Sequence, residues 1–433
     1  MTTSYREAAR WLYSLQRLGI KVGLGNTRRL MALFGRPERR FRSVHIAGTN
    51  GKGSTAAFLL AIAEAAGLKC GLTISPHLKE PTERIYAGGR DISKRDFARL
   101  AFAVRDAAAA YNAAHSADPL LPTFFEALIA MAFLYFAEQE VDLAVVETGL
   151  GGRLDSTNVV RPEVSVITSI GIEHTEYLGH TIRAIAREKA GIVKPGTPVV
   201  TAARQPEALE VIGRIAGKRR APLVVIGRDA DLVSERGRLA YRRGDSVLRR
   251  LDLALAGEHQ IRNAACAVAT AEILAERGFP IAARHIRTGL TRARWPGRLE
   301  LFAGRPPWLV DCAHNPAGVR TLAEHLASAH GHRRILFVFA AMQDKDYRQE
   351  LEILAPLAAA WIFTQPALDR AERPETLAAA CPGNAPKHGR RRVADALRFA
   401  AQMEGKFDLV VVAGSIFLVG EAYDFVSRHR PKG

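Results

Sequence analysis

The stretch that most constrains this chain is a glycine-rich turn between an apolar run and an alanine- and leucine-rich run. Residues 41–46 are typical of a short strand, residues 55–66 of a helix, and residues 47–55 (AGTNGKGST) join them. Such a turn lets backbone N–H groups approach a phosphate closely, and the amino end of the helix adds partial positive charge. We therefore predict a nucleotide-phosphate loop between this strand and this helix.

Two side chains of the loop have phosphate chemistry. Lys52 can reach a terminal phosphate, and the hydroxyl of Ser54 can bind Mg²⁺. The spacing is a variant of the usual G-x-x-x-x-G-K-[ST] pattern, because Gly53 stands between Lys52 and Ser54. The alternative is a left-handed glycine turn that ends in a solvated lysine and needs no nucleotide. The predicted phosphate-contacting residues are Gly48, Thr49, Asn50, Gly51, Lys52, Gly53 and Ser54.

Length and composition are those of a globular protein. A chain of 433 residues with 48% hydrophobic and 24% charged residues can form two or three domains with real cores. There is no signal-peptide pattern at the start and no run of about 20 apolar residues. The four cysteines are far apart and show no metal-binding spacing, so we expect reduced thiols. We expect a soluble, cytoplasmic protein that does not bind a membrane.

The formal net charge of +17 raises the question of nucleic-acid binding. The arginines are spread along the whole chain, with short clusters such as residues 390–392, and they form no stripe interleaved with aromatic residues. Small anionic substrates explain this charge equally well. We expect small-molecule substrates and no nucleic-acid partner.

Apolar, β-branched runs alternate with helical patterns along the chain. Such alternation favours parallel sheets with helices on both faces. A Pro/Gly-rich segment at residues 294–298 (RWPGR) separates two series of this kind. We predict an α/β protein with a P-loop-type parallel-sheet domain over residues 1–295 and a smaller Rossmann-like domain over residues 296–433. The further predicted strands are 69–74, 141–147, 164–170, 197–202, 223–226, 308–312, 335–340, 361–364 and 409–413.

Three other segments carry local predictions. Residues 5–18 form an amphipathic helix followed by a glycine-containing break and a second short helix, which we expect to pack on the first domain. Residues 228–251 are polar with weak alternation and suggest a β-hairpin. Residues 263–277 are expected to be helical.

Residues that follow the strands of a parallel sheet meet at one edge, so Ser75, Glu147 and His174 are expected to lie near the phosphate loop. Glu147 ends an apolar run, and a buried carboxylate is costly unless it is paired or bound to a cation. Mg²⁺ beside the loop is the simplest explanation. The alternative for Glu147 is a salt bridge to Arg153 or to a lysine. The alternative for His174 is an ordinary hydrogen-bonded histidine without a metal.

Two further residues are ambiguous from the sequence alone. Lys189 lies in a helical segment, and by default it would be a solvated residue. Asp311 ends a strand before residues 313–316 (AHNP). A ribose or metal contact and a helix cap are equal alternatives for this aspartate.

Taken together, the motifs resemble those of the folylpolyglutamate synthase/dihydrofolate synthase family of the Mur ligase superfamily. They occur in the same order over nearly the whole chain, and that combination is far more specific than any single motif. The motifs are AGTNGKGS (47–54), SPHL (75–78) with ERI (83–85), TFFE (123–126), ETGLGGRLDSTN (147–158), EKAGIVKPG (188–196), HQ (259–260) with Asn263, WPGR (295–298), DCAHNP (311–316), DKD (344–346) and GSIFLVG (414–420).

The resemblance implies a monomeric ligase that joins L-glutamate to dihydropteroate or a reduced folate, using ATP and Mg²⁺, in folate biosynthesis. Lys52 and Ser54 match contacts to phosphate and a first metal ion, and Glu147 matches a metal ligand. His174 and Ser75 match residues near a second metal ion, and Lys189 matches an N-carboxylated lysine. The implied catalytic residues are Lys52, His174 and Lys189, and the implied metal ligands are Ser54, Ser75, Glu147, His174 and Lys189.

The resemblance also implies contacts to ATP and to the folate. Beyond the loop, ATP would be held by Asn263, Arg298, Asp311 and His314. The pteroate or folate would be contacted by Arg84, Thr123, Phe124 and Asp155. The chain departs from the family pattern at Glu173, where an aspartate is usual, and at residues 79–82 (KEPT) in the substrate loop, which leaves the preferred folate form open.

Two other functions remain open on the sequence. A cell-wall Mur-type peptide ligase would share the loop and the mechanism but would use UDP-linked substrates. A P-loop ATPase acting on nucleic acid is favoured only by the net charge.

Overall fold

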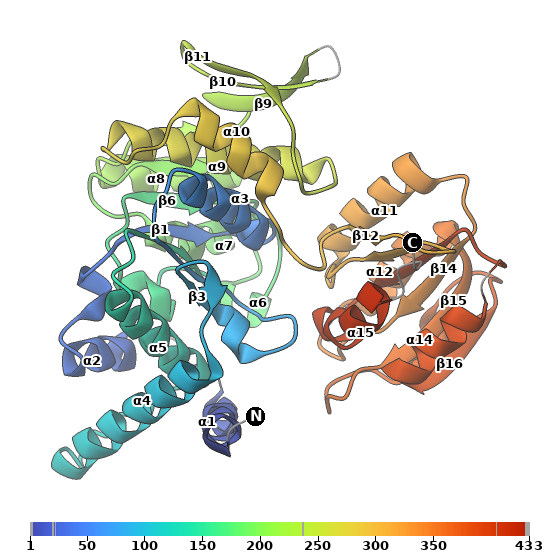
Figure 1. Cartoon of the computed structure of the whole chain (residues 1–433), viewed down its shortest axis with the longest axis horizontal. Helices are drawn as coiled ribbons and strands as arrows, with labels where there is room; N and C mark the ends of the chain where they lie inside the picture. The colour runs from blue at the N-terminus through green and yellow to red at the C-terminus, as the bar shows by residue number, and fades with distance from the viewer. Residues whose placement is uncertain (1–2, 20, 22, 236–237, 404, 429–433) are drawn as a thin grey trace. The chain divides into compact units, whose positions relative to one another are not determined.

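The computed structural model describes residues 3–19, 21, 23–235, 238–403 and 405–428. The chain divides into two compact units, one of residues 1–254 and 260–294 and the other of residues 255–259 and 295–433. Both units combine a sheet with helices on both faces, so the predicted α/β class is confirmed (Figure 1). The short segment 255–259 groups with the second unit, although no sequence pattern separates it from its neighbours.

The first unit contains an eight-stranded sheet in the order β4-β3-β2-β5-β1-β6-β7-β8. The central strand β1 pairs in parallel with β5 on one side and β6 on the other. These three strands are buried along almost their whole length, which is why they appear as continuous apolar runs. The strands are β1 Arg42–Ala47, β2 Cys70–Thr73, β3 Ile85–Ala87, β4 Arg90–Asp91, β5 Leu143–Glu147, β6 Val164–Ile167, β7 Val199–Thr201 and β8 Leu223–Val225.

The helices of the first unit cover this sheet and extend its core. The predicted packing of the N-terminal helix is confirmed, because Tyr5, Ala8 and Leu12 of α1 are buried in one hydrophobic cluster with residues of α4 and α5. The α-helices are α1 Thr3–Ser14, α2 Gly25–Leu33, α3 Lys52–Ala65, α4 Lys94–Ala114, α5 Phe124–Glu138, α6 Thr175–Leu178, α7 Ile182–Lys189, α8 Pro206–Lys218, α9 His259–Glu276 and α10 Ala283–Arg292. Short 3₁₀ helices are η1 Leu15–Leu18, η2 Pro37–Arg39, η3 Pro81–Arg84, η4 Ser156–Val159 and η5 Ala190–Ile192.

The predicted hairpin at residues 228–251 has one more strand than expected. It is a three-stranded antiparallel sheet of β9 Ala230–Glu235, β10 Arg238–Arg243 and β11 Ser246–Leu251, seen beside α10 in Figure 1. The alternation is weak because only a few side chains of the sheet, such as Leu232 and Tyr241, are buried.

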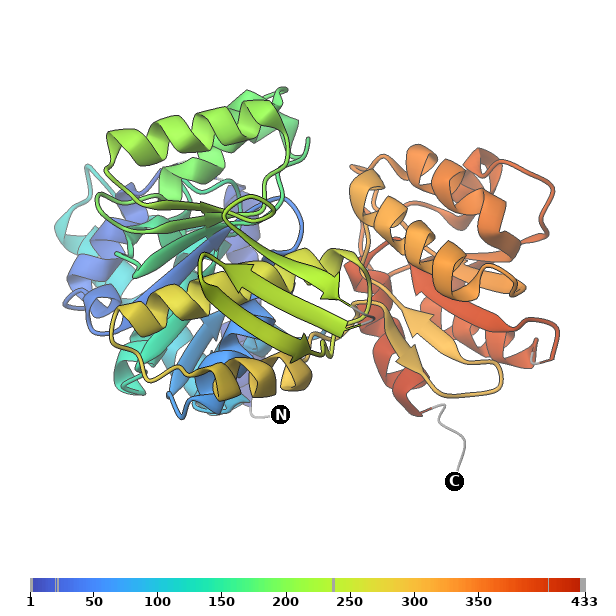
Figure 2. The ribbon, with the colours of Figure 1, turned by 90° about the horizontal axis from the view of Figure 1, so that it is seen from above.

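The second unit contains a six-stranded sheet in the order β12-β13-β17-β14-β15-β16. Figure 2 shows helices on both faces of this sheet, drawn orange and red. The strands are β12 Glu300–Phe302, β13 Trp308–Val310, β14 Ile335–Phe339, β15 Ala358–Gln365, β16 Lys387–Arg392 and β17 Leu409–Ala413. The helices are α11 Pro316–His330, α12 Tyr347–Leu354, η6 Ala355–Leu357, α13 Pro374–Ala380, α14 Val393–Gln402 and α15 Ile416–Arg428.

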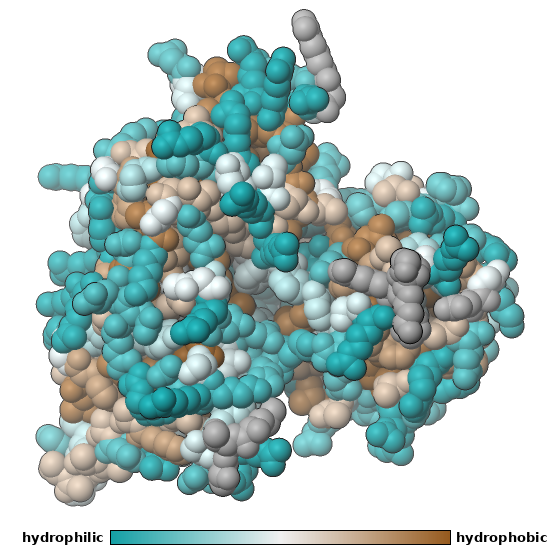
Figure 3. Space-filling model, viewed as in Figure 1, coloured by the Kyte–Doolittle hydropathy of each residue, from teal (hydrophilic) through white to brown (hydrophobic). Residues whose placement is uncertain are grey.

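Among the described residues, no helix is long and apolar enough to cross a membrane. Hydrophilic side chains predominate on the face of the molecule seen in Figure 3.

Candidate active site

The predicted phosphate loop connects the end of β1 to the start of α3. Its glycines are required by the backbone and by close neighbours: φ is +152° at Gly48 and +88° at Gly51. A Cβ atom at Gly48 would lie 1.8 Å from Oγ1 of Thr168, and one at Gly51 would lie 2.3 Å from Oδ1 of Asn263. The loop therefore packs directly against the end of β6 and against α9.

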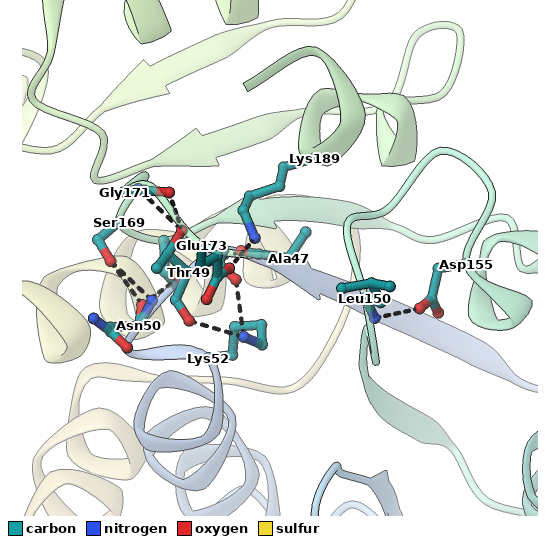
Figure 4. Close-up of polar contacts among 12 residues, drawn as sticks. Ala47, Thr49, Asn50, Lys52, Leu150, Asp155, Ser169, Gly171, Glu173 and Lys189 are labelled. Atoms are coloured by element: carbon teal, nitrogen blue, oxygen red, sulfur yellow. Dashed lines mark hydrogen bonds and ion pairs between the residues drawn. The ribbon is translucent and has the colours of Figure 1, made fainter. Parts of the chain in front are cut away.

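Hydrogen bonds fix the loop to the segment that follows β6 (Figure 4). The backbone N–H of Thr49 donates to the carbonyl of Ser169 at 2.7 Å, and that of Asn50 donates to Ser169 Oγ at 3.1 Å. Thr168 Oγ1 donates to the carbonyl of Asn50 at 2.8 Å. The predicted strand 164–170 was three residues too long, because the chain turns after Ile167 to make these contacts. Thr168 and Ser169 are site residues that the sequence analysis missed.

Lys52 begins helix α3, three residues earlier than predicted. Its Nζ atom donates to the carbonyl of Gly48 at 2.8 Å and to that of Thr49 at 3.0 Å. The ammonium group is thus held over the loop, and the first turn of α3 directs backbone N–H groups toward the same side. This arrangement suits a phosphate group. The side chain of Lys52 is also hydrogen-bonded within the loop rather than only solvated.

Ser54 is buried in the first turn of α3 and is connected to α9. Gln260 Nε2 donates to Ser54 Oγ at 3.2 Å, and Asn263 Nδ2 donates to Gln260 Oε1 at 2.9 Å. The structure therefore places Asn263, a predicted ATP contact, beside the loop. Gln260 belongs to the HQ motif (259–260), and the motif alone does not indicate its hydrogen bond to Ser54.

Glu147 is the last residue of β5 and is 4% exposed. Its partner in the parallel register is Ile46 of β1, so the carboxylate lies one strand away from the phosphate loop. Oε2 accepts the backbone N–H of Ser75 at 3.4 Å, which brings together two of the predicted metal ligands. Arg153, the named alternative partner of Glu147, pairs with Glu188 at 3.0 Å.

Lys189 is 1% exposed, and the prediction of a solvated helix residue is therefore wrong. Its Nζ atom forms an ion pair with Oε1 of Glu173 at 2.7 Å (Figure 4). Burial lowers the pKa of Lys189 to about 8, although the charge of Glu173 opposes this shift. Burial alone would raise the pKa of Glu173, but the charges of Lys189 and Lys52 hold it below the usual range. Glu173 thus belongs to the site.

His174 follows Glu173 with left-handed backbone angles, φ 45° and ψ 44°, and is the N-cap residue of α6. A non-glycine residue in this region is uncommon and marks a constrained position. The constraint turns the chain sharply between the end of β6 and α6, on the loop side of the sheet.

The metal prediction can be tested against the donors present. Within the described ranges no three or more His, Cys, Asp or Glu side chains are grouped as a metal site. The hydroxyl of Ser54 and the carboxylate of Glu147 are hard oxygen donors of the kind that Mg²⁺ prefers, and they fit such an ion. The amine of Lys189 does not fit while it is a cation paired with Glu173, because a positive charge repels a metal ion.

The predicted folate side chains Arg84 and Phe124 lie together in the first unit. Arg84 Nε donates to His77 Nδ1 at 2.8 Å, and its guanidinium lies over the ring of Phe124, 5.2 Å from the centroid. Tyr13 of α1 stacks on Phe124 with 5.5 Å between ring centroids. Burial lowers the pKa of His77 to about 3, so this imidazole is neutral. Tyr13 and His77 complete an aromatic and cationic cluster. His77 lies in the SPHL motif (75–78), whereas no sequence motif pointed to Tyr13.

Thr123 and Asp155 make structural contacts. Thr123 caps helix α5, and its Oγ1 accepts the N–H of Glu126 at 3.3 Å. Asp155 accepts the N–H of Leu150 at 2.7 Å and that of Thr157 at 3.0 Å, which fixes the glycine-rich loop after β5. Burial raises the pKa of Asp155 against the effect of these hydrogen bonds. Both residues position elements at the site.

The remaining predicted ATP residues belong to the second unit. Asp311 is buried, and its carboxylate accepts the N–H groups of Leu299 and Ala313, each at 2.9 Å. The helix-cap alternative for Asp311 is wrong, because Asn315 caps α11 through the N–H of Gly318. His314 Nδ1 is hydrogen-bonded to the carbonyl of Cys312 at 2.8 Å, which orients the ring. Burial raises the pKa of Asp311, and the nearby charge of Arg298 opposes that shift.

Comparison with known proteins agrees with this architecture. Residues 107–271 match the Mur ligase middle domain, and residues 297–416 match the Mur ligase, glutamate ligase domain. A dihydrofolate synthase/folylpolyglutamate synthase of Bacillus subtilis is 38% identical over 97% of this chain and 99% of its own length. The chain belongs to the folylpolyglutamate synthase/dihydrofolate synthase family.

Solved structures of this family are similar over nearly the whole chain. Folylpolyglutamate synthase of Mycobacterium tuberculosis, complexed with ADP and AMPPCP, aligns with a TM-score of 0.89 at 32% identity over 98% of both chains. Folylpolyglutamate synthase of Thermotoga maritima aligns with a TM-score of 0.86 at 32% identity, over 98% of this chain and 97% of the other. The family membership predicted from the motifs is confirmed.

Proposed function

We propose that this chain is an ATP-dependent ligase that joins L-glutamate to dihydropteroate, to reduced folates, or to both, within folate biosynthesis. The observation that carries the proposal is the position of Lys52 Nζ, which is bonded to Gly48 and Thr49 over a glycine loop at the end of the central strand. The full-length similarity to folylpolyglutamate and dihydrofolate synthases favours this function over a cell-wall peptide ligase and over an ATPase acting on nucleic acid. We further propose a cytoplasmic monomer without a nucleic-acid partner.

The reaction proceeds in two steps. A carboxylate oxygen of the folate or pteroate attacks the γ-phosphorus of ATP, ADP leaves, and an acyl phosphate forms. The neutral amine of glutamate, which has lost a proton, then attacks the acyl carbon, and inorganic phosphate leaves with one oxygen of the original carboxylate. Negative charge develops on the transferring phosphoryl group in the first step, and Lys52 with the loop N–H groups stabilises that charge.

Ser54 and Glu147 are the residues proposed to hold Mg²⁺, with Gln260 orienting the Ser54 hydroxyl. When bound, this ion neutralises phosphate charge and orients the phosphoryl group for in-line attack. His174, Ser75 and Lys189 are proposed at a second metal ion. For Lys189 this requires conversion of the amine to a carbamate, which replaces a cation with an anionic oxygen donor.

The remaining proposed contacts are those to ATP and to the folate. We propose that Asn263 of the first unit and Arg298, Asp311 and His314 of the second contact ATP. Arg84 and Phe124 provide a cationic and aromatic surface for the folate. Thr123 and Asp155 support that surface through the α5 cap and the loop after β5.

The first prediction concerns the range of acceptor substrates. Because the surface proposed for the folate, with Arg84 over the ring of Phe124, would contact the pterin rather than a glutamate tail, we expect both dihydropteroate and a reduced folate to support glutamate-dependent phosphate release. The measurement compares the two acceptors, and a UDP-linked peptide acceptor, under the same ATP and glutamate concentrations. Turnover with the reduced folate alone would restrict the chain to folylpolyglutamate synthesis. Turnover with the UDP-linked acceptor alone would overturn the proposed function.

A further inference from the structure

A pocket of about 660 Å³ lies in the second unit, at the carboxyl ends of β15 and β16. Ligands of open α/β sheets bind at this edge. Gln365 is the last residue of β15 and Arg392 is the last residue of β16. They are partners in the parallel register, so they lie side by side at the carboxyl edge of the sheet. The lining residues are Gln343, Gln365, Pro366, Ala367, Leu368, Asp369, Arg373, Arg391, Arg392, Val393, Ala394 and Glu421.

The charges of the lining point to one class of ligand. Three arginines, Arg373, Arg391 and Arg392, provide planar guanidinium groups that bind carboxylates in a bidentate manner. Two carboxylates, Asp369 and Glu421, provide acceptors for an ammonium group. A glutamate has two carboxylates and one ammonium, and a γ-glutamyl chain presents one free carboxylate at each residue. Both are complementary to this mixed but predominantly basic lining.

Helix α14 adds to the positive potential of the pocket. It begins at Val393, and both Val393 and Ala394 line the pocket. Its N-cap residue is Arg392, whose side chain makes no capping bond because a guanidinium has no acceptor. The first N–H groups of α14 are therefore directed to the pocket side without a side-chain cap, next to the arginines.

The wall formed by the loop after β15 is held in place from three directions. The N–H of Ala367 donates to Glu421 Oε1 of α15 at 2.8 Å. Gln365 Nε2 donates to the carbonyl of Ala371 at 3.0 Å, and the N–H of Glu372 donates to the carbonyl of Ala341 at 2.9 Å. The shape of the pocket is thus built into the fold, and this reduces the entropy lost when a ligand binds.

We propose that this pocket binds glutamyl carboxylates, either those of the incoming L-glutamate or those of the γ-glutamyl chain of an extended folate. The proposal rests on the proposed function, because that function makes glutamate and γ-glutamyl folates the ligands at hand. Arg391 and Arg392 from β16 and Arg373 beside α13 are assigned as the carboxylate contacts, and Asp369 and Glu421 as the groups facing an ammonium.

The test uses the full-length enzyme with Arg391→Ala/Arg392→Ala and, separately, Arg373→Ala. We expect KM to rise about ten-fold or more, with kcat within about two-fold, because each lost charged contact contributes about 1.5 kcal/mol or more. A rise in KM for L-glutamate with a monoglutamyl acceptor assigns the pocket to the incoming amino acid. A rise in KM confined to triglutamyl folate assigns it to the γ-glutamyl chain.

Two control variants distinguish a loss of ligand binding from a loss of folded structure. Arg398→Ala removes an arginine of α14 that pairs with Asp395 and does not line the pocket, and it should leave both KM values unchanged. Arg391→Lys/Arg392→Lys keeps the charge and should recover part of the affinity. Wild-type KM values for both ligands in the alanine variants, or equal losses in the alanine and lysine variants, would overturn the proposal. Failure of the wild-type enzyme to ligate glutamate would instead refute the proposed function.

Discussion

Replacement of Lys52 with alanine should lower kcat by about 10²- to 10³-fold while the fold remains intact, because this ammonium stabilises charge that develops on the transferring phosphoryl group. The hydrogen bonds of its side chain go to backbone carbonyls of its own loop, Gly48 at 2.8 Å and Thr49 at 3.0 Å, so the substitution breaks no hydrogen bond between distant elements. The measurements are steady-state kcat and the thermal unfolding midpoint of the same preparations.

A matched control for this prediction is Lys218→Ala, which removes an exposed lysine from the last turn of α8. This variant should keep the wild-type kcat. If Lys52→Ala also kept nearly normal turnover, the assignment of residues 47–55 as the phosphate loop would be wrong.

Replacement of Lys189 with alanine should leave the enzyme nearly inactive, with partial recovery on addition of a small carboxylate such as acetate. A carbamate on Lys189 would supply anionic oxygens to a hard cation, and acetate can occupy the space that the side chain leaves. We expect a carbonyl ¹³C resonance from labelled bicarbonate in the wild-type enzyme that is absent from Lys189→Ala. The spectrum reports on the modification independently of turnover.

The ion pair with Glu173 also gives Lys189 a structural function, so the experiment must distinguish a loss of stability from a loss of catalysis. Breaking a buried pair can cost about 3–5 kcal/mol, because one charge is left without its partner. The double variant Lys189→Met/Glu173→Gln keeps the bulk and leaves no unpaired charge, and it should fold yet remain inactive. A fully active Lys189→Ala variant, or a wild-type enzyme without the ¹³C resonance, would reduce Lys189 to the structural partner of Glu173.

The sheets were predictable where strands are buried on both faces. β5 and β17 are wholly buried, so β17 appears in the sequence as an uninterrupted apolar run and β5 as an apolar run that ends at Glu147. β16, with the sequence KHGRRR, is a partly exposed edge strand, and its side chains give no apolar signal. β3 and β4 are short strands at the other sheet's edge, and their pairing depends on the antiparallel turn between them.

The candidate site was predictable where its residues are consecutive. The glycine loop and Lys52 lie within nine residues, so the local sequence pattern is enough to predict how they are arranged. The contacts of Thr168 and Ser169 with Asn50 join residues more than 100 positions apart, and no local pattern reports them. The burial of Lys189 was equally hidden, because its partner Glu173 lies 16 residues earlier, before α6 and α7.

In the proposed mechanism, the site activates a carboxylate as an acyl phosphate before glutamate attacks. The most direct test is a single-turnover reaction with ATP, L-glutamate and an acceptor whose reacting carboxylate is labelled with ¹⁸O, followed by mass spectrometry of the released phosphate. One ¹⁸O atom should appear in phosphate for each glutamate joined, because the phosphate leaves with an oxygen of that carboxylate. Release of unlabelled phosphate during ligation of glutamate would contradict the mechanism.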